Sequence, residues 1–197
     1  MKRWPWLLCL LLLSSRLWAF DNEQLAQQLS AADVVRGEFV QEKYLRSLAI
    51  PLSSRGQFVL SKQLGLLWKV RQPFAQTYRI DAQGVSLLAD NVWQIQPGQN
   101  VAARQSRLFL AVLQGDQSVL EADFTLQLQG NAQQWQLQLL PKAVFLQQIF
   151  KVIEIHGGAL VERIELHETQ GDRTVMRMLN SQADSALLDD EQHAFQL

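Results

Sequence analysis

Apolar and polar residues alternate along much of the chain, most clearly between residues 123 and 140. In this stretch, DFTLQLQGNAQQWQLQLL, every second residue is apolar on each side of a break at Gly130-Asn131-Ala132. Successive side chains of a strand point to opposite faces of a sheet, so the pattern predicts a hairpin with one apolar and one polar face. Some other part of the fold must cover the apolar face.

The same alternation predicts further short strands, separated by turn residues such as Pro51, Gln72-Pro73, Asp90-Asn91 and Pro97-Gly98. Besides the hairpin, we expect strands at residues 35–45, 54–62, 65–72, 76–82, 85–90, 91–96, 145–155, 159–168 and 174–181. About ten or eleven short strands with short connections are typical of antiparallel meanders.

Two segments have helical spacing instead. Residues 21–33 begin with Asp21 as a candidate N-cap and place Leu25 and Leu29 on one face. Residues 104–113 place four apolar side chains at helical spacing, namely Leu108, Phe109, Val112 and Leu113. A long antiparallel sheet curls, and its concave face must be filled, covered or left as a cavity. We therefore expect a mainly β fold, an incomplete antiparallel β-barrel covered by two or three α-helices.

The first twenty residues, MKRWPWLLCLLLLSSRLWAF, have the layout of a secretory signal. Lys2-Arg3 precede an apolar run that ends at Leu13, and this run is shorter than the roughly 20 residues of a membrane-spanning helix. We expect cleavage after Ala19, which makes residues 1–19 a signal peptide and residues 20–197 a single domain.

Cleavage would change both the cysteine count and the charge. It removes Cys9, the only cysteine of the 197 residues, so the mature chain would have no disulfide. It also removes Lys2, Arg3 and Arg16, which leaves 15 of the 18 basic residues against 19 acidic ones, a net charge of −4. Nucleic acid and anionic bilayers are therefore poor candidates for the main partner.

The sequence offers little for catalysis. His156, His167 and His193 lack metal-site spacing, and the chain has no Gly-x-Ser-x-Gly motif. His156 precedes Gly157-Gly158, which predicts a turn. Three glutamates at polar strand positions are expected in solvent, although a carboxylate pair among them remains open: Glu42, Glu154 and Glu165. We predict no enzyme, no cofactor and no metal.

Several small motifs follow one another in a characteristic order. They are Phe39-Val40-Gln41; Gly56, with Trp68 twelve residues later and Gln72-Pro73 beyond it; Asp90-Asn91-Val92-Trp93 followed by Pro97; LLPKA at 139–143; and Phe150 and Gly158. In this order, the motifs resemble the LolA family of periplasmic carriers of outer-membrane lipoproteins. The resemblance covers essentially the whole mature chain.

That resemblance implies an incomplete barrel closed by helices, with an apolar interior that receives acyl chains. The predicted lining is Phe39, Phe58, Leu60, Trp68, Tyr78, Ile80, Trp93, Ile95, Phe124 and Leu126, any of which could equally be plain core. The predicted lid residues are Leu25, Leu29, Leu108, Phe109 and Val112. The hairpin's apolar face would then line the interior, and its glutamines would meet water.

In the LolA family, an arginine followed by proline hydrogen-bonds to the lid and acts as a latch. The corresponding position here is Lys62-Gln63. Lysine keeps the charge but lacks the planar fork of donors, so a lid held by Lys62 would be less tightly specified. A solvated lysine at a strand end is the alternative.

The resemblance implies a monomeric periplasmic carrier that moves acylated lipoproteins from an inner-membrane donor complex to an outer-membrane acceptor. The departure at Lys62-Gln63 leaves two alternatives open. The cargo could be another lipid, such as a glycolipid or a lipid-linked pigment precursor. The protein could also be a β-rich periplasmic adaptor without a cavity.

Overall fold

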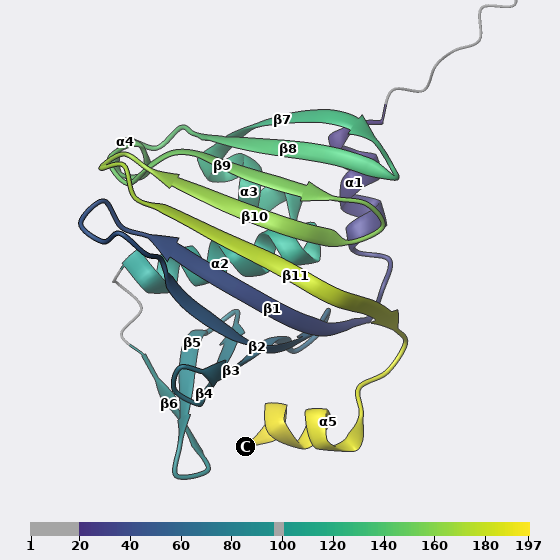
Figure 1. The fold of residues 1–197 in the computed structure, drawn as a ribbon. Coiled ribbons are helices and arrows are strands. Elements are labelled where there is room, and N and C mark those ends of the chain that lie inside the picture. Colours follow the sequence, from purple (N-terminus) through teal and green to yellow (C-terminus); the bar gives the residue numbers. More distant parts are fainter. Residues whose placement is uncertain (1–19, 97–100) are drawn as a thin grey trace, which may run out of the picture.

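The fold is built on one antiparallel sheet of eleven strands, seen in a computed structural model that describes residues 20–96 and 101–197, without the side chains of 101–107 (Figure 1). The strand order is β6-β5-β4-β3-β2-β1-β11-β10-β9-β8-β7. The strands are β1 (Val34–Tyr44), β2 (Leu52–Ser61), β3 (Gly65–Gln72), β4 (Gln76–Asp81), β5 (Gly84–Ala89), β6 (Val92–Ile95), β7 (Phe124–Asn131), β8 (Gln134–Pro141), β9 (Phe150–Gly157), β10 (Val161–Glu168) and β11 (Arg173–Asp184). The sheet curls but does not close, which confirms the predicted incomplete barrel.

Five helices accompany the sheet in the described residues: α1 (Asn22–Leu29), α2 (Val101–Gln114), α3 (Gln117–Asp123), α4 (Val144–Gln147) and α5 (Asp189–Gln196). The predicted α1 and α2 are confirmed, and the Asp21 side chain accepts a hydrogen bond from the Gln24 N–H at 2.9 Å. The other three helices were not predicted. Helix α4 occupies part of the strand expected at 145–155. Helix α5 forms near the C-terminus, where the sequence pattern predicts no particular element.

The two faces of the sheet are covered differently. Helices α1, α2 and α3 pack on what we call the inner face, where the large hydrophobic core lies. Helix α5 packs on the opposite, outer face, over a small cluster of Val34, Val59, Leu67 and Phe195. Strand β1 shows the alternation that produces this division, because Val35 and Phe39 belong to the inner core and Val34 to the outer cluster.

The central pair of strands in the sheet, β1 and β11, brings together segments near the start and the end of the sequence. Strand β1 pairs with β11 from Val34 opposite Asp184 to Tyr44 opposite Arg173, with one register shift between Arg36 and Glu38. The two hairpin-connected halves, β1 to β6 and β7 to β11, meet along this pairing.

The expected signal peptide, residues 1–19, and the expected turn at Pro97-Gly98 lie outside the described residues. Among the helices that the structure describes, none has the length and apolar character needed to cross a membrane.

Candidate functional site

Aromatic side chains from three strands and one helix meet at the centre of the inner face. The rings of Phe39 and Trp68 stack with their centroids 3.6 Å apart, and Phe58 lies 6.4 Å from Trp68. Phe109 of α2 meets Trp68 edge to face at 5.0 Å. A predicted lid residue thus contacts Trp68, the ring that two further predicted lining residues surround.

Most of the predicted lining lies in this interior. Phe39, Phe58, Leu60, Trp68, Ile80 and Phe124 are buried in the inner core, and Tyr78 and Leu126 are partly buried against it. Trp93 and Ile95 lie elsewhere. Trp93 packs against the outer cluster, where its indole N–H donates to the Ala194 carbonyl at 3.2 Å, and Ile95 is 71% exposed. The structure therefore takes these two residues of β6 out of the predicted set.

The predicted lid residues come together on the inner face. Leu25 and Leu29 of α1 and Phe109 and Val112 of α2 are buried in the inner core, and Leu108 packs against it. In the turn between α2 and α3, Gly115 adopts a left-handed φ of +66°, and a Cβ there would lie 2.9 Å from the Ala26 carbonyl oxygen of α1. This close approach packs the helices as one cover.

Two small pockets lie in the described part of the interior beneath the helices. A pocket of about 20 Å³ lies between α1, α3 and strands β7 to β9, and its walls include Leu25, Leu120, Leu126 and Trp135. A second pocket of about 10 Å³ lies under Leu29, between Phe58 and Leu60. Spaces of this size hold about one water molecule. Neither pocket is large enough to hold an acyl chain without movement of its walls.

Lys62 ties α1 to the sheet. Its Nζ donates to the Ser30 carbonyl oxygen, at the C-terminus of α1, at 3.0 Å. A cation at this end of a helix is also favoured by the helix dipole. Next to it, the Gln114 side chain at the end of α2 lies 3.5 Å from the Ser61 carbonyl. The turn after β2 thus contacts the ends of both cover helices.

Gln28 makes a second tie that sequence reasoning missed. Its Nε2 donates to the Gly158 carbonyl oxygen at 2.6 Å, and the buried Trp135 indole N–H donates to the same oxygen at 2.7 Å. Nothing in the sequence separates Gln28 from Gln24 and Gln27 of the same helix, because the partner lies 130 residues away.

Comparison with known protein families identifies relatives of the chain. The model of the family described as outer membrane lipoprotein carrier protein LolA-like matches residues 15–197. The chain belongs to this LolA-like family. No curated protein sequence matches the chain.

Solved structures with the same LolA-like fold are distant in sequence. A LolA superfamily protein from Nitrosomonas europaea has 10% identity and a TM-score of 0.50, over 85% of this chain and 95% of that chain. A crystal structure of MucB has 17% identity and a TM-score of 0.51, over 88% of this chain but only 62% of that one. The MucA/MucB complex from Pseudomonas aeruginosa has 16% identity and a TM-score of 0.50, over 85% and 57%. At these identities the likeness concerns the fold alone.

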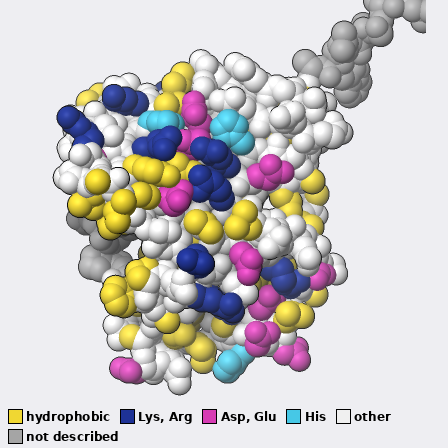
Figure 2. Space-filling view, in the orientation of Figure 1, with side chains coloured by type: hydrophobic (Ala, Val, Ile, Leu, Met, Phe, Trp, Pro, Cys, Tyr) yellow, Lys and Arg dark blue, Asp and Glu magenta, His cyan; other side chains and the backbone are white. Residues whose placement is uncertain are grey.

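The outer face of this LolA-like sheet carries a cluster of charged residues over β9, β10 and β11 (Figure 2). Glu165 is only 7% exposed and forms ion pairs with Arg163 at 2.6 Å and Arg173 at 3.6 Å, so the prediction that it lies in solvent is wrong. His156 lies in β9, opposite Arg163, and not in a turn. Glu154, His156 and Glu165 each offer a ligand atom within 4.8 Å of the others. Because arginines already neutralise Glu165, we assign no metal to them.

Glu42 belongs to the same face and is also paired. The Oε2 of Glu42 accepts a hydrogen bond from Arg177 at 2.6 Å and another from the Tyr44 hydroxyl at 3.1 Å. These hydrogen bonds hold the pKa of Glu42 below its usual value. The Glu42 carboxylate is therefore already paired with side chains of the same sheet.

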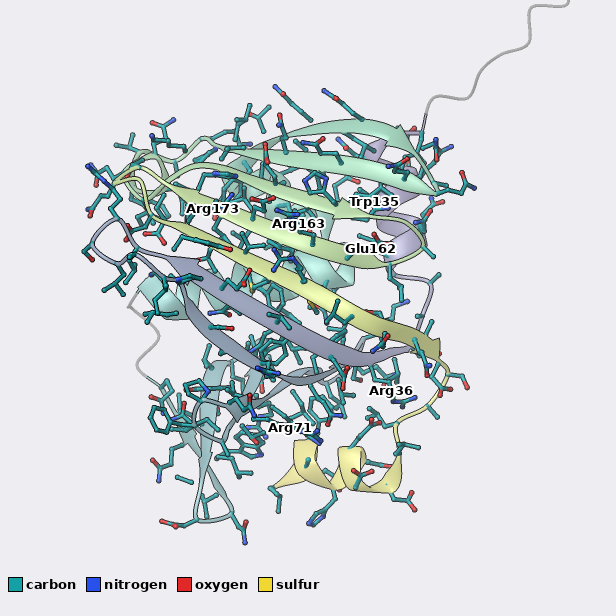
Figure 3. The ribbon with its side chains drawn as sticks, viewed as in Figure 1. Arg36, Arg71, Trp135, Glu162, Arg163 and Arg173 are labelled. Carbon is teal, nitrogen blue, oxygen red and sulfur yellow. The ribbon has the colours of Figure 1, made fainter. Side chains whose placement is uncertain are left out.

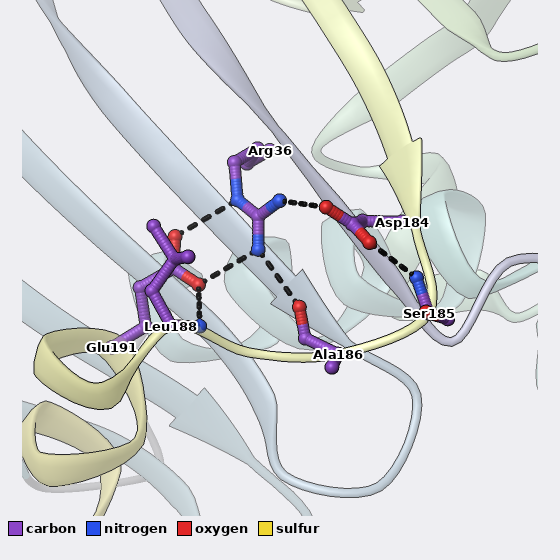
Figure 4. A network of polar contacts seen from close by, with 6 residues as sticks. All are labelled: Arg36, Asp184, Ser185, Ala186, Leu188 and Glu191. Carbon is purple, nitrogen blue, oxygen red and sulfur yellow. Dashed lines mark hydrogen bonds and ion pairs between the residues drawn. The ribbon is translucent and has the colours of Figure 1, made fainter.

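Arg36 fastens α5 to the outer face (Figure 4). Its guanidinium donates to both carboxylate oxygens of Glu191, at 3.0 and 2.9 Å, and to Asp184 at 2.7 Å. Burial acts to raise the pKa of Glu191, but the hydrogen bonds from Arg36 and the Leu188 N–H outweigh it, and the pKa is lowered. This bidentate pair fixes the position of α5 and keeps the Glu191 carboxylate ionised.

Proposed function

We propose that this protein is a periplasmic carrier that holds the acyl chains of lipoproteins between the inner face and helices α1 to α3. The observation that carries the proposal is the apolar interior, shared between strands and cover helices and centred on Trp68 and Phe109. Each methylene moved from water into such an interior contributes about 0.8 kcal/mol, which favours acyl cargo without requiring a fixed shape.

The ties on the cover helices support a carrier that must also release its cargo. Lys62 and Gln28 hold α1 through a few hydrogen bonds to backbone carbonyls, the shortest of which are those to Ser30 and Gly158. A hydrogen bond of this kind contributes about 0.5–1.5 kcal/mol, far less than burial of a whole acyl chain. Cargo binding can therefore displace the helix, and loss of cargo lets it return.

Family membership supports the wider setting of the proposal. The family is described as one of outer membrane lipoprotein carriers. Such a carrier would take its cargo from a donor at the inner membrane and deliver it to an acceptor at the outer membrane. We propose the same partners here. The protein would act as a monomer, exported by a signal peptide that is cleaved after Ala19.

A lipid other than a lipoprotein is the second candidate cargo. The observation that favours it is Lys62-Gln63, which replaces the arginine and proline of the family latch. A weaker latch suits a cargo that is exchanged without a protein moiety to guide release.

Mass spectrometry of material that co-purifies with the mature protein from its native periplasm tests both candidates. Lipoprotein polypeptides carrying acyl groups support the first candidate, and lipid without polypeptide supports the second. An empty protein that also fails to bind palmitic acid overturns both candidates. The remaining alternative is then a β-rich adaptor that has no lipid cavity.

A further inference from the structure

Strands β10 and β11 separate before either of them ends (Figure 1). Their last paired residues are Arg163 and Arg177, although β10 begins at Val161 and β11 continues along β1 to Asp184. Register shifts flank the separation, between Val161 and Arg163 on the β9 side and at Arg36/Glu38 on the β1 side. Such irregularities bend strands away from their neighbours. We call the opening the β10–β11 split.

The split holds an open groove of about 600 Å³, within the size range of small-molecule sites. Its walls are residues 159–163 and 177–181. At the outer rim lie polar side chains, including Glu162 and Arg163, which Figure 3 labels on β10. Val161 and Met178 belong to the inner core and form its deeper, apolar wall.

The groove and the interior share a wall. The 10 Å³ pocket under Leu29 is bounded on one side by four residues that also line the groove: Leu160, Val161, Met178 and Ser181. Its other walls include Phe58 and Leu60 of the predicted lining. These four side chains are therefore what separates the outer groove from the space beneath the cover helices.

The dividing wall is suited to opening. Met178 is an unbranched, flexible side chain that can change rotamer at low cost. The Ser181 hydroxyl is buried without a hydrogen-bond partner, so its displacement breaks no bond. Neighbouring Asn180 already has a left-handed φ of +53°. An acyl chain needs no hydrogen-bond partners along such a path.

We propose that an acyl chain of the cargo enters the interior through the β10–β11 split, leaving its polar end at the outer rim beside Glu162, Arg163 and Arg177. This inference rests on the proposed carrier function and specifies its entry site. A peptide strand added to the free edge of β11 is the rival occupant, but it would place polar backbone against Val161 and Met178.

Thiol labelling tests the proposal, because the chain from Phe20 onward contains no cysteine. Leu179 lines the groove and is 40% exposed, so a Leu179→Cys variant should react with iodoacetamide in the lipid-free protein. With free palmitic acid at about ten times its Kd, about nine-tenths of the protein is occupied, and alkylation should slow about tenfold. Ser53→Cys, at an exposed position of β2, is the control and should react at an unchanged rate.

A second variant tests passage through the split. Ser181→Phe adds bulk to the dividing wall and should slow palmitic acid association. Ser53→Phe is its control.

Palmitic acid that binds without slowing alkylation at position 179, or that slows it equally at position 53, overturns the split as the entry site and leaves the carrier proposal standing. Unchanged kinetics in a folded Ser181→Phe variant have the same meaning. Palmitic acid that does not bind overturns the carrier proposal and the split together. Protection of position 179 by a co-purified polypeptide but not by palmitic acid favours strand addition and overturns the acyl assignment.

Discussion

The Nζ of Lys62 lies 3.0 Å from the carbonyl oxygen of Ser30, where helix α1 ends. Between these two residues, β1 and β2 pair from Val34 opposite Ser61 onward, and the Lys62 N–H donates to the Asp33 carbonyl, so the side-chain contact extends this pairing to the end of α1. It joins the position of the family latch to the element that the resemblance identifies as a lid.

Removing this contact should speed cargo exchange. Lys62→Leu deletes one hydrogen bond that favours the closed position of α1, so a bound fluorescent fatty acid should exchange about two- to tenfold faster. Stopped-flow displacement by unlabelled palmitic acid measures the rate. Lys151→Leu, which removes an exposed lysine from β9, should exchange at the wild-type rate. Equal rates in both variants would show that Lys62 is a solvated lysine and not a latch.

Gln28 should stabilise α1 independently of cargo. Gln28→Leu removes the donor to the Gly158 carbonyl and two longer contacts, to the Ala132 and Ala159 carbonyls. The Gly158 carbonyl still accepts from Trp135, so the loss should be about 1 kcal/mol. Amide hydrogen exchange of α1 should then be about fivefold faster, with β1 unchanged. Gln27→Leu, an exposed position one residue away, serves as the control. A uniform change across the sheet would mean that Gln28 supports global rather than local stability.

Tryptophan fluorescence should distinguish the two faces of the sheet. Trp68, Trp93 and Trp135 are the tryptophans after residue 20. In a variant that retains only Trp68, palmitic acid should shift the emission, because Phe109 on the moving cover contacts this ring. In a variant that retains only Trp93, on the outer face, the emission should stay within error of the lipid-free value. A shift from Trp93 alone would place the cargo under α5 instead.

Acid should loosen α5. The pKa of Glu191 is lowered in the folded protein, so its stabilising contribution is complete above the ordinary glutamate value of 4.5 and is lost as the pH falls through the folded value. Glu191→Gln should cost about 2 kcal/mol at pH 7 and flatten the acid limb of the stability curve. Urea unfolding at pH 7 and pH 4 measures both effects.

Asp190→Asn provides the matched control for that experiment, since it removes a neighbouring exposed charge from the same helix. Its acid limb should match that of the wild type. If it flattens as much as that of Glu191→Gln, net charge and not the Arg36 pair governs the acid response.

The alternation of side chains predicts β7, β8 and β9 best, because these strands have one buried and one wetter face over most of their length. It could not say which face the helices cover. Trp93 and Ile95 were assigned inward, but β6 is an edge strand and the side that carries Trp93 is covered by α5. Helix α5 itself was missed because its eight residues bury only Glu191 and Phe195, too few to give a helical pattern.

Contacts between distant segments were beyond the sequence pattern. The Lys62 tie was anticipated only through resemblance, and the Gln28 tie was not anticipated at all. The β10–β11 split depends on register shifts in two neighbouring ladders. One of them coincides with the consecutive polar residues Glu162-Arg163, but this local break in the alternation does not by itself predict that two strands separate.

The pairing of β1 with β11 has a consequence for the folding of a chain that is exported as we propose. A chain that crosses a membrane with its N-terminus first delivers β1 early, while its partner is among the last segments to arrive. Until then one long edge of the nascent sheet has no neighbour and is open to association with other chains. A premature stop codon ahead of Arg173 would leave this edge permanently bare, removing the middle of the sheet and not its margin.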